Sequence, residues 1–362
     1  MMIKKLIIAL PLLLFFSIAV DAQKLVKRDE KKIDSLIQTV FGNKNEPGGV
    51  FMMTRKGNVL YRKAFGKANL ELDVDMTPDH VFQIGSMTKQ FTAVAILMLE
   101  QQGKLNVNDP ISKYIKDYPN GDKITIHHLL THTSGIKDFT KMKSLSSIAQ
   151  KEMKPEAMVD FFKNEPVDFA PGEKFDYNNS GYVVLGYIIE SVSGETYENF
   201  IRKNIFDKAG MSSSYYASDR KVIPKRAYGY HQKEQEFVNK TVISFSVPFS
   251  SGSLLSTADD MLKWQQALNG NVLLNPEETQ KAFQTYNLNN GKEFTYGYGW
   301  HLKEISGIPD REHGGSIFGF KSMGIYIPQE DIYVIGFSNC DCHSPTEITR
   351  NMAKIAVASV KK

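Results

Sequence analysis

The chain has 362 residues and a formal net charge of +4, and 42% of its residues are hydrophobic. Because the charge is mild and no dense stripe of lysine and arginine occurs, nucleic acid is not expected as a partner. The length suits one large domain or two that pack intimately. With only two cysteines, the chain is not a disulfide scaffold and must be held together by a hydrophobic core.

The first 22 residues are typical of an export signal. Lys4 and Lys5 precede an apolar run over residues 6–20, which is shorter than the roughly 20 residues that span a membrane comfortably. Val20-Asp21-Ala22 has the small-x-small character that favours cleavage before Gln23, with an uncleaved anchor as the alternative. We therefore expect an exported protein, periplasmic or extracellular, with no stable membrane span once the leader is removed.

Periodicity and turn residues predict helices and strands at both ends of the chain and a mainly helical middle. In chain order they predict a helix over 28–41, a hairpin of 50–55 and 59–62, a helix from 86 to 103, helices near 129–130, 158–162 and 182–192, strands over 320–327 and 332–337, and a closing helix over 347–360. This order indicates an α/β (α+β) fold in which an antiparallel sheet built from both termini carries flanking helices. We expect one domain over 23–362, with its α/β part at about 23–104 and 246–362 and an inserted helical part at about 105–245.

The Ser-x-x-Lys pattern carries the first candidate for nucleophilic catalysis, and it occurs four times, at Ser86, Ser134, Ser218 and Ser359. Only Ser86 follows a glycine and opens a long apolar-faced helix, where Lys89 three residues later shares its face. Free N–H groups and the helix dipole at that position favour a negatively charged oxygen. The alternative is that Ser86 only caps the helix, a role that suits serine well.

Two further patterns could complete a catalytic site. Tyr-x-Asn occurs three times, and the copy at Tyr177 and Asn179 stands out because it lies on a loop before an apolar helix, where functional side chains are commonly presented. His313-Gly314-Gly315-Ser316 lies beside a predicted strand, and its glycines would let a substrate backbone approach closely. Each pattern also has an ordinary structural explanation. Tyr177 could be an amphipathic core or surface residue, and the two glycines could simply form a turn.

Taken in order, these motifs resemble the active-site serine penicillin-recognising enzymes, and most closely the branch of class C β-lactamases and D-alanyl-D-alanine carboxypeptidases. The similarity rests on Phe82-x-Ile84-Gly85-Ser86-Met87-Thr88-Lys89, Tyr177-x-Asn179 and His313-x-Gly315. Supporting stretches lie at residues 129–135, 171–179, 252–260 and 296–300. The resemblance covers the chain from about residue 30 to its end.

The resemblance implies a sheet with helices on both faces, a helical region beside it, and an active site in the cleft between them. Ser86 would be the acylated nucleophile, Lys89 the base or proton relay, and Tyr177 the proton donor to the leaving group. Asn179 would bind the substrate amide, and the backbone N–H groups of Ser86 and Ser316 would bind the oxyanion. Lys89 can act as a base at neutral pH only if burial or a charged neighbour lowers its pKa from about 10.4.

The last motif departs from the Lys-Thr-Gly of many β-lactamases, since this chain has His313-Gly314-Gly315. The change argues against efficient β-lactam hydrolysis and leaves acyl transfer intact. In the family that strand position faces the substrate's carboxylate, so we expect His313 to bind the anion and Gly315 to line the site. A histidine titrates near 6.5 and would lose this attraction as the pH rises through neutrality.

Two clusters offer metal ligands, but neither completes a site. His127, His128 and His132 lie close in sequence without a carboxylate partner, and a structural role is expected for His132. Cys340-Asp341-Cys342-His343 supplies two thiolates and an imidazole but no fourth ligand, and its cysteines could equally be free or form a local disulfide. We expect no metal and no cofactor.

Three function classes fit these residues: a serine peptidase or esterase, a β-lactamase, and a non-catalytic penicillin-binding or sensor domain. Intact Ser86, Lys89 and Tyr177 argue against the third class. The favoured expectation is an exported serine hydrolase that forms an acyl-serine intermediate on an amide or ester bond. Its partner would be a small-molecule or peptide substrate, and D-amino peptides, peptidoglycan stems and small esters all remain open.

If the leader is an export signal, the mature protein begins at Gln23. The intact mass of protein purified from its native host should therefore match residues 23–362, because signal peptidase removes the preceding segment. Retention of residues 1–22 in the purified protein would show instead that the segment is an anchor.

Overall fold

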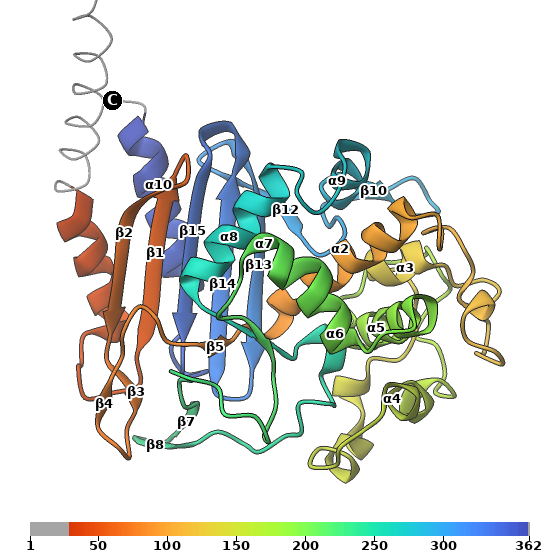
Figure 1. Ribbon diagram of the computed structural model, residues 1–362, viewed down its shortest axis with the longest axis horizontal. Coiled ribbons are helices and arrows are strands. Elements are labelled where there is room, and N and C mark those ends of the chain that lie inside the picture. The colour runs from red at the N-terminus through yellow and green to blue at the C-terminus, as the bar shows by residue number, and fades with distance from the viewer. Residues whose placement is uncertain (1–28, 361–362) are drawn as a thin grey trace, which may run out of the picture.

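The computed structural model describes residues 29–360 and is built around one antiparallel sheet (Figure 1). Its strands run in the order β12-β13-β14-β15-β1-β2, so the first hairpin of the chain lies beside its last strands. β1 and β15 are antiparallel, with Met53 opposite Val334. The sheet confirms the expectation that both ends of the chain build it. Its strands are β1 (Gly49–Arg55), β2 (Asn58–Phe65), β12 (His301–Ile305), β13 (Ile308–Ile317), β14 (Phe320–Ile327) and β15 (Ile332–Ser338).

Different helices cover the two faces of this sheet. The opening helix, residues 29–41, and α10 (Thr346–Val360) pack on one face. On the other face, α2 (Thr88–Gln101) and α8 (Ala258–Asn269) share a second core with the strands. Successive strand residues point to opposite faces, so Val334 belongs to the first core and its neighbour Ile335 to the second. Burial on both sides explains why β15 lacks charged side chains and is buried along its whole length.

The other elements lie outside the main sheet, and helices predominate among them between residues 105 and 245. The helices are α3 (Ile126–Leu130), α4 (Pro155–Phe162), α5 (Asn179–Ser193), α6 (Tyr197–Ile201), α7 (Asp207–Ala209) and α9 (Pro276–Ala282). The strands are β3 (Lys67–Asn69), β4 (Val74–Asp75), β5 (Phe82–Gln83), β6 (Tyr215–Tyr216), β7 (Tyr230–Lys233), β8 (Glu236–Asn239), β9 (Leu254–Ser256), β10 (Tyr286–Asn287) and β11 (Glu293–Phe294). The division of the chain at about residues 105 and 245 remains a prediction. Within residues 29–360, no helix combines the length and the apolar character needed to cross a bilayer.

The helix expected to start at Ser86 begins two residues later. Gly85 adopts φ +54°, and the chain turns through η1 (Gly85–Met87), a 3₁₀ turn, before α2 starts at Thr88. Gly103, at φ +69°, follows the end of α2 as the sequence predicted. Residues 88–99 of α2 are all buried, so this helix lies in the middle of the molecule with no face in water.

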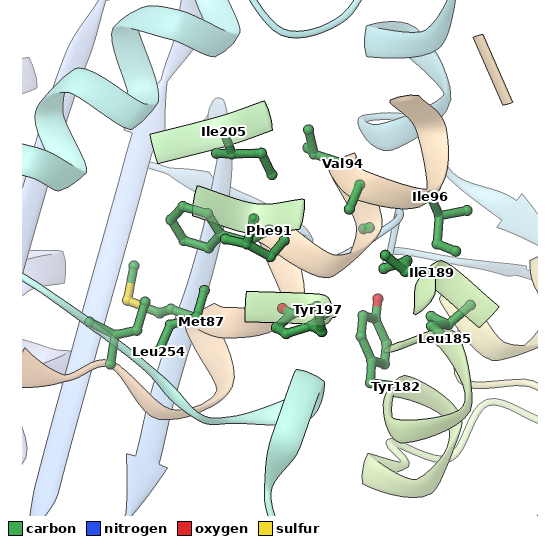
Figure 2. Close-up of a cluster of buried hydrophobic side chains, with 14 of the residues drawn as sticks. Met87, Phe91, Val94, Ile96, Tyr182, Leu185, Ile189, Tyr197, Ile205 and Leu254 are labelled. Carbon is green, nitrogen blue, oxygen red and sulfur yellow. The ribbon is translucent and has the colours of Figure 1, made fainter. Parts of the chain in front are cut away.

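The core around α2 joins the sheet to the helical part of the chain. Phe91 stacks on Trp264 of α8, with ring centroids 4.0 Å apart. Figure 2 shows buried side chains of this core that come from α2, α5, α6 and β9: Phe91, Val94, Ile96, Tyr182, Leu185, Ile189, Tyr197 and Leu254.

A glycine lets α5 dock against η6 (Phe249–Ser251), a turn that carries part of the site described below. A Cβ at Gly186 would lie 2.0 Å from Ser250 Oγ and 2.6 Å from Phe249 Cε1. Ser250 Oγ donates a hydrogen bond to the Tyr182 carbonyl at 2.8 Å, which fixes the contact. No side chain fits at position 186 unless the turn moves away.

Replacing Gly186 with alanine should therefore destabilise the protein. Glycine to alanine inside a helix normally gains about 1 kcal/mol, but the forced displacement of η6 should cost about 1–3 kcal/mol and lower Tm. Gly181→Ala on the same helix is the control, because its Cβ would come no closer than 3.4 Å to the Leu129 carbonyl. Equal Tm changes in the two variants would contradict the packing argument.

Candidate active site

Ser86 and Lys89 face each other at the start of α2. Lys89 Nζ lies 3.2 Å from Ser86 Oγ, as the three-residue spacing predicted. The N-cap positions of η1 and α2 are Ile84 and Met87. Ser86 occupies neither, so its hydroxyl does not serve as the helix cap that the alternative required.

Lys89 is completely buried, and its ammonium group is held by polar groups from two other segments. Nζ donates to Asn179 Oδ1 at 2.8 Å and to the Ser251 carbonyl at 2.9 Å, and it lies 4.8 Å from the centre of the Tyr177 ring. Burial lowers the pKa of Lys89 from 10.5 to about 7, although the carboxylate of Asp138 opposes this shift. A substantial fraction of Lys89 is therefore neutral at neutral pH and able to accept a proton from Ser86.

Asp138 is a buried carboxylate that sequence reasoning missed. Its Oδ1 accepts from the Thr140 N–H at 2.9 Å, and its Oδ2 accepts from Asn179 Nδ2 at 3.2 Å. These bonds orient the Asn179 amide so that its oxygen faces Lys89. The motif at residues 129–135 ends three residues before Asp138, but no spacing rule connected this acid with α5.

Tyr177 lies on the loop before α5, where the sequence placed it. Asn178 caps α5 by accepting from the Gly181 N–H, and its own N–H donates to His132 Nδ1 at 3.0 Å. The His132 ring packs against the Tyr177 ring with centroids 4.3 Å apart. His132 therefore has the positioning contacts expected of a structural residue.

The Tyr177 hydroxyl is buried and has no hydrogen-bond partner among the described residues. Burial raises the pKa of Tyr177 well above 10, and the neighbouring Ser86 hydroxyl lowers it only in part, since no hydrogen bond of good geometry joins the two. Tyr177 thus keeps its proton at neutral pH and has it free to donate to a substrate.

Glycines bring β13 against the turn that carries Ser86. A Cβ at Gly315 would lie 2.0 Å from the Ile84 carbonyl, and one at Gly85 would lie 3.0 Å from the Ser316 nitrogen. Ser86 and Ser316 consequently line the same cavity. This arrangement suits an oxyanion site made by their backbone N–H groups, a role that remains a prediction.

The surroundings of His313 on β13 do not suit the role expected for it. The ring is buried, Nδ1 lies 2.6 Å from the Gly314 carbonyl and Nε2 lies 3.1 Å from the Tyr296 hydroxyl. The carbonyl requires a proton on Nδ1, so Nε2 accepts from Tyr296 and no N–H is left for a substrate. Burial, with His301 and Lys89 nearby, lowers the pKa of His313 well below 6.5. His313 is therefore a neutral residue that supports the site, rather than a cation that binds a carboxylate.

The cavity above Ser86 has a volume of about 420 Å³. Its floor carries Ser86, Tyr177, Asn179 and Ser316, and its walls are mostly apolar side chains from residues 139–145, 243–248 and 317–318. Another cavity, of about 70 Å³, lies between the opening helix and α10 and shares no residue with this one. The cavity therefore offers a mainly apolar surface to the substrate around a polar floor.

The two metal-ligand clusters of the sequence are otherwise engaged. Cys340 and Cys342 form a disulfide, which removes both thiolates from metal binding. His127 Nδ1 bonds to the Tyr298 hydroxyl at 2.7 Å, and His128 Nδ1 accepts from the Thr125 N–H at 3.1 Å in the capping box of α3. Of the three states left open for the cysteines, the structure has the disulfide.

A known protein family matches nearly the whole described part of the chain. The family model described as Beta-lactamase matches residues 33–358. The chain belongs to the β-lactamase family. Among its β-lactamase family relatives, the putative penicillin-binding protein PbpX of Bacillus subtilis is 32% identical over 328 residues, which are 88% of this chain and 80% of that relative.

Solved structures of the same class share this fold. The octameric penicillin-binding protein homologue from Pyrococcus abyssi superimposes with a TM-score of 0.80 at 30% identity, covering 91% of this chain and 78% of that one. The penicillin-binding protein from Bacillus halodurans gives 0.77 at 28% identity, covering 89% and 98%. The D-amino acid amidase from Ochrobactrum anthropi gives 0.77 at 22% identity over 91% and 99%, which shows likeness of fold. The family supports a serine hydrolase of the β-lactamase and penicillin-binding class.

The lowered pKa of Lys89 gives a testable pH dependence that needs no known substrate. The rate at which a fluorophosphonate labels the serine should rise with pH through an apparent pKa of about 7, because only the neutral amine can accept the Ser86 proton. Asp138→Asn should move this rising limb of the pH profile to lower pH, because the carboxylate that favours the ammonium form of Lys89 is gone.

The exposed Asp122 offers a matched control, and Asp122→Asn should leave the limb in place. Labelling that follows a group titrating near 10, or a limb that moves upward in Asp138→Asn, would contradict the assignment of Lys89 as the base.

Proposed function

We propose that this protein is an exported serine hydrolase that cleaves an amide or ester bond through an acyl-serine intermediate, with D-amino peptides of the peptidoglycan type as the favoured substrates. One observation carries the proposal. A fully buried lysine with a pKa of about 7 lies 3.2 Å from a serine hydroxyl that opens into a cavity. A buried amine next to a nucleophilic hydroxyl is the arrangement that activates serine for acyl transfer.

The proposed reaction uses each group in its observed position. Neutral Lys89 takes the proton of Ser86 as Oγ attacks the carbonyl carbon, and the backbone N–H groups of Ser86 and Ser316 stabilise the oxyanion. Tyr177 gives its proton to the departing amine or alkoxide, and the proton held by Lys89 makes good that loss. Water then attacks the acyl-serine by the same sequence of proton transfers and releases the acid.

The substrate class is supported by the family and by His313. The relatives are penicillin-binding proteins by name, and the resemblance stated above includes D-alanyl-D-alanine carboxypeptidases, which act on D-amino peptides. A neutral, internally bonded His313 stands where many β-lactamases of the resemblance have lysine. This favours a peptidase or esterase over a β-lactamase as the principal activity.

Export is part of the proposal and rests on two observations. The leader over residues 1–22 lies outside the described residues, so its sequence alone supports secretion. The Cys340–Cys342 disulfide suits an oxidising compartment such as the periplasm or the extracellular space.

The proposal is tested by turnover and by the site of acylation. The protein should hydrolyse D-amino acyl p-nitroanilides or esters, and mass spectrometry should place a phosphonate adduct on Ser86. Ser86→Ala should lower kcat by at least about a thousandfold, because the acyl acceptor is absent. Labelling by fluorescent penicillin without turnover of any substrate would indicate a sensor, and rapid penicillin hydrolysis would indicate a β-lactamase.

A further inference from the structure

Asp341 is a charged side chain that lines the active-site cavity, and the proposed reaction gives it no role. Among the described residues that line the cavity, Asp341 alone carries a charge, and the surrounding walls are largely apolar. Asp341 lies on the loop after β15, between the two cysteines of the disulfide. A carboxylate partly withdrawn from water attracts a cation more strongly than one on an open surface.

The position of Asp341 is fixed by the backbone around it. Asn339 is fully buried; its Oδ1 accepts from the Gly48 N–H, and its Nδ2 donates to the Tyr228 carbonyl at 2.8 Å. The Asp341 N–H donates to the Tyr230 carbonyl at 3.3 Å. With the disulfide closing the loop, the carboxylate is held at the cavity rather than free to swing into solvent.

The two oxygens of this carboxylate differ in their contacts. Its Oδ2 accepts from His231 Nδ1 at 2.5 Å, while the Thr241 N–H donates to His231 Nε2 at 2.9 Å. Because Nε2 is an acceptor, this imidazole is the neutral tautomer with its proton on Nδ1. Oδ1 of Asp341 has no hydrogen-bond partner among the described residues. One oxygen is thus oriented by a neutral donor and the other is available to a ligand.

The register of the sheet sets how far this carboxylate is from the reacting carbonyl. Ser316 on β13 is opposite Lys321 on β14, which is opposite Ser338 on β15. Two strand spacings separate Ser316 from Ser338, or about 10 Å, and Asp341 lies beyond Ser338 at the same end of the sheet. A cation that reaches Asp341 must therefore be separated from the scissile carbonyl by an extended spacer.

The geometry points to Asp341 as a specificity residue that selects substrates whose acyl part carries an ammonium group on a spacer of several bonds. This inference rests on the proposed function, because it assumes that the carbonyl is attacked by Ser86. Either an amino side chain or the terminal amine of a neighbouring residue could supply such an ammonium group. An α-ammonium next to the scissile carbonyl is too close to the floor to reach the carboxylate.

The test compares p-nitrophenyl esters of hexanoic, 2-aminohexanoic and 6-aminohexanoic acid in wild type and Asp341→Asn. In wild type, kcat/KM for the 6-amino ester should exceed that for the neutral ester, and added salt should reduce the ratio. Asp341→Asn should lower this ratio by about fivefold to tenfold. Asp341→Lys should instead favour the monoester of adipic acid, whose far end is a carboxylate.

The exposed Asp122 again provides a charge-matched control, since Asp122→Asn removes the same charge away from the cavity. An equal loss of the ratio in both variants, or no loss in Asp341→Asn, overturns the inference while ester hydrolysis by wild type keeps the proposed function. If only the 2-amino ester loses its advantage over the neutral ester, the requirement for a spacer is wrong. If wild type hydrolyses none of the esters, the proposed function fails, and calorimetric binding of the 6-amino and neutral esters to Ser86→Ala, with and without Asp341→Asn, still decides the role of Asp341.

Discussion

The active site depends on one physical constraint, which is that the amine of Lys89 is completely buried. An ammonium ion removed from water is costly, and the chain responds by lowering the pKa of Lys89 and surrounding Nζ with acceptors and aromatic faces. Those acceptors come from α5 and η6, segments far from α2 in sequence. Catalytic competence and correct packing of the helical part are therefore the same requirement, because neither acceptor is in place unless α5 and η6 dock on α2.

Close backbone contacts, rather than large side chains, set the dimensions of the site. Gly315 allows β13 to approach the Ile84 carbonyl, and Gly186 allows α5 to approach Ser250. Each contact brings a backbone group to the candidate site: the Ser316 nitrogen beside the turn that carries Ser86, and the Ser251 carbonyl beside Lys89. Rigid backbone is well suited to this task because it needs no side-chain ordering when substrate binds.

Much of the fold followed from local patterns, whereas parts of the site did not. Stretches rich in β-forming residues, together with turn residues, located β14, β15 and the first hairpin, and a glycine before an apolar helix singled out Ser86 among four candidates. Asp138 escaped because its importance depends on contact with α5, which no sequence spacing encodes. His313 was read with the wrong chemistry because its partner Tyr296 and its burial arise only in the folded chain. The state of Cys340 and Cys342 was undecided because their separation is compatible with several bonding states.

The pairing of β1 with β15 has a consequence for how the protein is made. Gly48 and Asn339, which are joined by a hydrogen bond at one end of this strand pair, are 291 positions apart. Until the last strands leave the ribosome, the opening hairpin has an edge with no neighbour, and the main sheet cannot close. Contacts this distant along the chain also fold slowly. Assembly of the sheet must therefore wait until β15 has been made, so the newly made chain passes through a period in which the edge of β1 that later pairs with β15 is exposed.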